Sequence, residues 1–151
     1  MEDKVLEQMS VNPLDVQIGG EHYKHCGMQP IELTEGVRMY PSCSSIVRYV
    51  FRHKQKNGRE DLDKALQYVN FIEKYDNWYE GYQVVRDEYM TTFADIEKTN
   101  ELFYDFIRLN PQLGENQVRV ILAIQHKDID ALKRYVLKEI EQNYPKDSCK
   151  E

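Results

Sequence analysis

Apolar residues that recur at steps of three and four constrain this sequence most, because that spacing places them on one face of an α-helix. The pattern is clearest within REDLDKALQYVNFIEKYDNWYEGY, at Leu62, Ala65, Leu66, Val69 and Ile72. The first turn of the same segment carries three acidic residues, which suit the positive end of a helix dipole: Glu60, Asp61 and Asp63. The segment therefore predicts a helix whose apolar face points into a core.

Further segments share this spacing and predict helices over residues 31–38, 44–56, 84–97, 99–110, 118–124 and 128–145. Ser42 follows Pro41 as a predicted N-cap, and Asp128 is the predicted N-cap of the last helix. The pair Asn57-Gly58 is a stop signal between two helices. Alternating runs rich in Val and Ile are missing, which argues against a large sheet. We therefore expect an all-α fold, a small multi-helix, bundle-like domain with a loop-rich N-terminal segment.

The length of 151 residues is typical of one globular domain. Apolar residues make up 41% of the chain and charged residues 30%, which fits a folded protein rather than a disordered one. The predicted organisation is a lead-in over residues 1–20, a helical domain over 21–82, a helical extension packed on it over 83–144, and a tail over 145–151.

Several locations and partners are disfavoured by composition. No run of about 18 apolar residues occurs, and the acidic start of the chain lacks the apolar core of a secretory signal. The three cysteines form no close pair, which suits a reducing cytoplasm. A formal net charge of −6 argues against sequence-independent binding to nucleic acid. We expect a cytoplasmic protein with no membrane and no nucleic-acid partner.

A basic stretch stands out against this acidic background. Five Lys or Arg residues and no acid lie between Ile46 and Arg59. Arg48, Arg52 and Lys56 are spaced four apart, so a continuous helix would place them on one face. Guanidinium groups one turn apart can hold a phosphate with forked donors. A solvated face that pairs with nearby acids explains the same residues equally well.

The segment GGEHYKHCGMQPIEL offers a second group of candidates. His22, His25 and Cys26 are suitable metal ligands by chemistry, but their spacing matches no established site, so no metal ligand set is predicted. His22 and Tyr23 could instead contact a base or a phosphate. A structural role, with Tyr23 as a core anchor, is at least as well supported.

Acidic and aromatic residues leave further alternatives open. Glu32 and Glu35, together with the acids that begin at Glu60, could hold Mg²⁺ through oxygen ligands. An aromatic strip could be a packing or oligomer interface, or a wall for stacked bases: Tyr68, Tyr75, Trp78, Tyr79 and Tyr82. The sequence has no GxxxxGK[ST], so P-loop chemistry is excluded, and it has no HExxH or GxSxG.

The order HY, QPIEL, IVRYVFRHKQKNGREDLDKALQYVNFIE resembles the SaV-like family of small phage domains of unknown function, over about residues 18–75. The matching positions are His22, Tyr23, Pro30, Ile31, Glu32, Arg48, Tyr49, Arg52, Lys56, Gly58, Glu60, Asp61, Leu62, Lys64, Ala65 and Tyr68. One branch of that family includes a phage kinase that phosphorylates deoxynucleoside monophosphates without a P-loop. The resemblance therefore implies an early phage protein that handles nucleotides, with phosphoryl transfer as one activity.

Together, the basic stretch and the resemblance define an expected site. Its nucleotide-binding residues are His22, Tyr23, Arg48, Tyr49, Arg52, Lys56, Arg59 and Lys64. Asp61 and Glu60 are the expected catalytic residues, with Mg²⁺ as the cofactor of the kinase reaction. Two alternatives remain: a nucleotide sponge without catalysis, and a module that binds a host protein. A homo-oligomer is a further candidate assembly.

Overall fold

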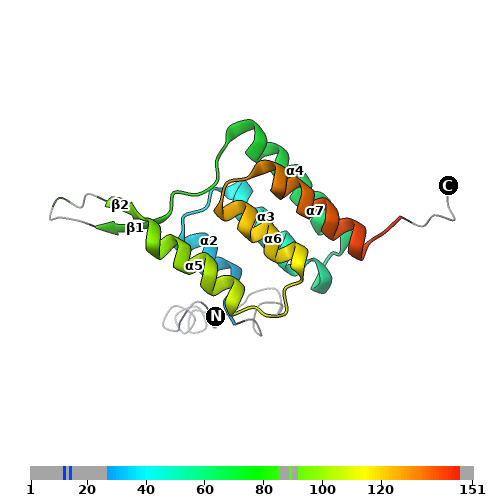
Figure 1. The fold of residues 1–151 in the computed structure, drawn as a ribbon, viewed down its shortest axis with the longest axis horizontal. Helices are drawn as coiled ribbons and strands as arrows, with labels where there is room; N and C mark the ends of the chain where they lie inside the picture. Colours follow the sequence, from blue (N-terminus) through cyan, green and yellow to red (C-terminus); the bar gives the residue numbers. More distant parts are fainter. Residues whose placement is uncertain (1–11, 13, 15–26, 86–88, 90–91, 147–151) are drawn as a thin grey trace, which may run out of the picture.

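The computed structural model describes residues 12, 14, 27–85, 89 and 92–146 (Figure 1). Its elements follow in the order α2 (Pro30–Gly36), α3 (Pro41–Arg52), the 3₁₀ turn η2 (His53–Gln55), α4 (Arg59–Tyr75), β1 (Tyr82–Val85), β2 (Thr92–Asp95), α5 (Ile96–Arg108), α6 (Glu115–Gln125) and α7 (Ile129–Asn143). The two strands form a small antiparallel sheet. The fold is therefore mainly α, and the prediction of a purely all-α fold was wrong in that respect.

The helices pack in neighbouring pairs around a shared core. α3 lies against α4, α6 against α7, and α2 against α5, while α4 also packs on α7 and α6 joins α3 to α5. Figure 1 shows α4 and α7 side by side, with the strand pair projecting from the bundle near the start of α5. The five helices from α3 to α7 each contribute a fully buried apolar side chain to the core, for example Ile46, Leu62, Phe103, Ile124 and Val136.

The predicted apolar face of α4 is confirmed. Leu62, Ala65, Val69 and Ile72 are buried, and Leu66 packs against them half-buried. The start of α7 also follows the prediction, because the Asp128 carboxylate accepts a hydrogen bond from the backbone N–H of Ala131 at 3.1 Å. Among the described residues, no helix combines the length and the apolar character that crossing a membrane requires.

The ends of α3 differ from the prediction. Its N-cap is Tyr40, with Pro41 at the first helical position, so the assignment of Ser42 as N-cap was wrong. Proline suits that position because its missing N–H would have no partner within the helix. α3 ends at Arg52 and continues as the short η2 turn, which leaves Lys56 outside the helix. Gly58 then reverses the chain with a φ of 62°, before α4 begins.

The predicted helix over residues 84–97 was wrong, because the described parts of that range form a strand pair and the start of α5. Val84 faces Phe93 and Val85 faces Thr92 in the antiparallel register, and β-branched and aromatic residues favour such pairs. Asp95 then caps α5 by accepting a hydrogen bond from the Lys98 N–H at 3.0 Å. The apolar spacing that suggested one helix is thus divided between a strand and a capped helix start.

Candidate functional site

A basic and aromatic face lies where α3 packs on α4, and it consists of Arg48, Tyr49, Arg52, Lys64 and Tyr68; we call it the α3–α4 face. The rings of Tyr49 and Tyr68 stack with centroids 6.0 Å apart and planes inclined by 20°. The Arg52 guanidinium carbon lies 4.9 Å from the centre of the Tyr49 ring, and the Lys64 ammonium lies 5.9 Å from it. Two cations are therefore gathered around one aromatic ring.

Arg52 is held in place from beneath by a buried acid. Its Nε lies 3.5 Å from Oδ2 of Asp61, whose side chain is fully buried. Asn57 donates to the same carboxylate from its backbone N–H and its amide, each at 3.3 Å. The Arg52 guanidinium itself forms no hydrogen bond with any described residue, and its buried Nε has no hydrogen-bond partner there. The N–H groups of Arg52 are thus held in a fixed position, but they have no hydrogen-bond acceptor among the described residues.

The other predicted cations are placed differently. Arg48 lies one turn before Arg52 on α3, is exposed, and donates to the Ser45 hydroxyl at 3.1 Å. Lys56 is exposed at the end of η2, so it does not continue the helix face of Arg48 and Arg52 as predicted. Arg59 is the first residue of α4 and pairs with Asp63 at 3.7 Å, both half-exposed. The structure therefore brings together four of the predicted binding residues on one face: Arg48, Tyr49, Arg52 and Lys64.

The predicted catalytic acids have structural partners instead of an open position. Asp61 is buried under Arg52, and the exposed Glu60 pairs with Lys64 at 3.4 Å along the same helix. In the part of the chain that the structure describes, no three Asp, Glu, His or Cys side chains gather closely enough to hold a metal ion. Glu32 instead accepts a hydrogen bond from the Gln29 N–H at 2.7 Å, which fixes the start of α2. The predictions for His22, Tyr23, His25 and Cys26 lie outside the described residues.

The aromatic residues that follow Tyr68 do not form one strip. Trp78 is buried and donates to Asp76 at 2.8 Å. Tyr79 packs on Phe103 with ring centroids 5.3 Å apart, whereas Tyr75 is 57% exposed at the end of α4. Core packing therefore explains Trp78 and Tyr79. Of these residues of the predicted strip, Tyr68 is the one that lies on the α3–α4 face.

A buried polar cluster that the sequence did not predict joins η2 to α7. His53 is fully buried, and its Nε2 lies 2.9 Å from Oε2 of Glu139. A carboxylate only accepts hydrogen bonds, so Nε2 donates to Glu139, and Nδ1 lies 2.9 Å from the Tyr144 hydroxyl. Asn143 donates to the second oxygen of Glu139 at 2.8 Å. A sequence signal did exist, because Glu139 lies between Val136 and Ile140 on the core-facing stripe of α7.

Electrostatics distinguish the members of this cluster. Burial of Glu139 raises the pKa of its carboxyl, but the hydrogen bond and charge of His53, with Lys54 and Asn143, outweigh burial and lower the pKa below its usual value. Burial and the charges of Glu139 and Asp61 raise the pKa of Tyr144. An ionised carboxylate and a neutral phenol thus face one buried imidazole. This arrangement closes α7 onto the end of α3 and leaves the imidazole no access to a substrate.

Comparison with known proteins finds a family model that matches part of this chain. The model of a family described as a protein of unknown function, DUF3310, matches residues 18–70. No curated protein and no solved structure matches this chain. The matched segment contains every residue of the α3–α4 face, whereas Glu139 and Tyr144 lie beyond it.

Proposed function

We propose that the α3–α4 face binds a nucleotide, with its phosphate on the cations and its base on the tyrosines, and that it does so without catalysis. The observation that carries this proposal is Arg52, whose guanidinium is fixed by Asp61 and Tyr49 while it forms no hydrogen bond with any described residue. A phosphate is the ligand whose oxygens match such a forked set of donors. Arg48 and Lys64 supply further positive charge beside it.

The aromatic pair supports a base in addition to a phosphate. The stacked rings of Tyr49 and Tyr68 are half-buried, so they form a supported wall on the protein surface. Stacking of a base on such a ring typically contributes about 1–3 kcal/mol and tolerates any base. His22 and Tyr23, which precede the described part of this region, remain proposed contacts for the base.

The placement of the predicted catalytic acids favours nucleotide binding without turnover over a kinase reaction. Phosphoryl transfer needs Mg²⁺ held by accessible oxygen ligands and a group that positions the nucleophile. Asp61 is fully buried beneath Arg52 and is not free for that role, which leaves the exposed Glu60, paired with Lys64 at the surface, as the one expected acid in reach of solvent within the described region. A deoxynucleoside monophosphate kinase is the runner-up. The phage setting and the cytoplasmic location implied by the resemblance remain predictions.

Isothermal titration with deoxynucleoside mono- and triphosphates, with and without Mg²⁺, tests this proposal. Arg52→Lys keeps a positive charge beside Asp61 but removes the fork, so we expect the dissociation constant to rise about tenfold with little loss of stability. Arg134→Lys, an exposed substitution on α7, is the matched control and is expected to leave affinity unchanged. Equal affinity of the wild type and Arg52→Lys would refute the phosphate contact.

Chromatography of the ligand after long incubation with the protein and Mg²⁺ separates the two activities. A binder returns the nucleotide unchanged, whereas a kinase converts a monophosphate and a triphosphate into two diphosphates. Product formation that depends on protein concentration would refute the non-catalytic half of the proposal and favour the kinase.

Binding of a host protein is a second candidate, supported by the strand pair. Val85 is 54% exposed at the end of β1 that faces Thr92, and Ile96 is 73% exposed at the start of α5, beyond the other end of the strand pair. Large exposed apolar patches are typical of protein interfaces, and this projecting element carries apolar residues at both ends. Pull-down from a host lysate with wild type and with Ile96→Asp tests this candidate. Retention of the same partner by both proteins would rule out this surface.

A further inference from the structure

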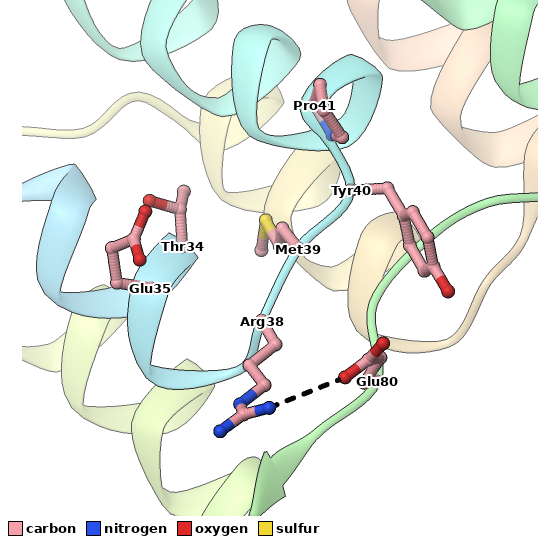
Figure 2. A pocket seen from close by; sticks show the side chains of 7 residues that line it. All are labelled: Thr34, Glu35, Arg38, Met39, Tyr40, Pro41 and Glu80. Carbon is pink, nitrogen blue, oxygen red and sulfur yellow. Dashed lines mark ion pairs between the residues drawn. The ribbon is translucent and has the colours of Figure 1, made fainter.

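A hollow of about 530 Å³ lies away from the α3–α4 face, between the end of α2 and the segment that follows α4 (Figure 2). Its volume is within the usual range for small-molecule pockets, about 300–1,000 Å³. Its lining residues are Thr34, Glu35, Arg38, Met39, Tyr40, Pro41 and Glu80. Two carboxylates against one guanidinium give the lining a net negative charge.

The walls of this hollow are held together by backbone hydrogen bonds between segments 37–40 and 78–81. The N–H of Tyr40 donates to the Trp78 carbonyl at 3.0 Å, and the N–H of Glu80 donates to the Arg38 carbonyl at 3.1 Å. Met39 and Tyr79 face each other as an isolated antiparallel bridge. Arg38 adopts a left-handed φ of 53°, which lets the chain turn from α2 into this ladder. The two acidic residues are therefore carried by a fixed frame.

Two polar groups of the hollow have few hydrogen-bond partners among the residues that the structure describes. Thr34 is 6% exposed, and its hydroxyl forms no hydrogen bond with another described residue. Glu80 has only the distant Arg38 guanidinium, 3.9 Å away, with both side chains about half-exposed. Exposed pairs at such a distance hold their partners weakly. Within the described part of the chain, the Thr34 hydroxyl and the Glu80 carboxylate are thus acceptors without strong donors.

The arrangement of these groups indicates the shape of a ligand. Figure 2 shows Glu35 on one side of the hollow and Glu80 on the other, with Met39 between them and the Arg38 guanidinium paired with Glu80 at 3.9 Å. The Tyr40 side chain stands beside Glu80, and an aromatic ring attracts a cation placed over its face. A ligand with a positive group at each end and a short apolar chain between them would match this order.

We propose that this hollow binds a small aliphatic diamine. One ammonium group donates to the Glu35 carboxylate and the Thr34 hydroxyl, and the other to the Glu80 carboxylate beside the Tyr40 ring. The methylene groups lie over the Met39 side chain. The proposal is independent of nucleotide binding, since it uses different elements and the opposite sign of charge.

Two-dimensional ¹H–¹⁵N NMR of the full chain, titrated with 1,4-diaminobutane at constant ionic strength, tests the proposal. We expect saturable shifts of the amides in residues 34–40 and 79–81. Butylamine has one ammonium group, so it should bind about fivefold more weakly, and 1,4-butanediol should cause no shifts. Shifts that do not saturate, or that equal concentrations of sodium chloride reproduce, would overturn the proposal.

Carboxamide variants locate the site. Glu35→Gln and Glu80→Gln each remove one negative charge at the surface, so each should raise the dissociation constant for 1,4-diaminobutane about fivefold while the protein stays folded. Glu115→Gln, an exposed acid at the start of α6, is the control and should bind as the wild type does. Unchanged affinity in both pocket variants would show that the amine binds elsewhere and would refute the assignment.

Discussion

Replacing Glu139 by glutamine removes one charge from the buried cluster while keeping the size of the side chain. The carboxylate is 3% exposed and accepts hydrogen bonds from His53 at 2.9 Å and from Asn143 at 2.8 Å. Hydrogen bonds to a charged group contribute about 1.5–3 kcal/mol each, and glutamine keeps part of them. We therefore expect Glu139→Gln to lower the free energy of unfolding by about 2 kcal/mol at pH 7, or the melting temperature by about 4–8 °C.

The pH dependence of this difference tests its cause. Because folding lowers the pKa of Glu139, its ionised form stabilises the folded state above the unfolded-state value of about 4.3. That contribution is lost as the pH falls through the lower pKa of the folded state. The difference between wild type and Glu139→Gln should accordingly be largest near pH 7 and shrink as the pH is lowered below 4.

Urea denaturation, followed by circular dichroism between pH 7 and pH 3, provides the measurement. Glu141→Gln, an exposed acid two residues further along α7, is the matched control and should change stability by less than about 0.5 kcal/mol. A loss at Glu139 no larger than in this control, or a loss that is the same at every pH, would show that the cluster does not clamp α7 electrostatically.

The thiol of Cys43 should resist iodoacetamide at pH 8 in the folded protein but react in urea, because burial raises its pKa to about 12 and Lys127 offsets this only in part. Since the chain has three cysteines, labelling is read on the peptide that contains Cys43, and rapid labelling of that peptide in the folded protein would contradict the prediction. Gly58→Ala should cost about 1–3 kcal/mol in urea titrations, because φ at this position is 62°. The added methyl group would lie 3.5–3.7 Å from the Tyr144 side chain, an ordinary contact distance, so the expected loss of stability comes from backbone strain and not from a clash. An unchanged free energy of unfolding in Gly58→Ala would refute this explanation. Tyr144→Phe should lower the free energy of unfolding by about 1–2 kcal/mol at pH 7, because it leaves the buried Nδ1 of His53 without its hydrogen-bond partner, and an unchanged stability would exclude that bond.

Local sequence patterns predicted most of the helices, but they did not predict which segments pair or pack with each other. The stripe on α4 and the Asp128 cap depend on residues within one or two turns, so the sequence contains the whole signal. The strand pair was missed because Val84 and Val85 satisfy a helical spacing as well as a strand, and their pairing with residues 92 and 93 decides between the two.

The candidate site shows the same limit. The basic stretch predicted that Arg48 and Arg52 share a face of α3, which depends on helix geometry alone. Asp61 was predicted as an acid that favours the helix dipole or catalyses a reaction, whereas tertiary packing buries it under Arg52. His53 and Glu139 are 86 residues apart in the chain, and no local pattern connects groups at that separation.

The packing of α4 on α7 also has a consequence for synthesis on the ribosome. α3 and α4 are complete once residue 75 has emerged, but the apolar surface that they turn toward α6 and α7 stays uncovered until residue 143 follows. At about 5–20 residues per second, this interval lasts roughly 3–14 s. During that time the nascent helix pair offers apolar surface to a chaperone, and this surface is covered when α7 packs on α4 and Glu139 meets His53.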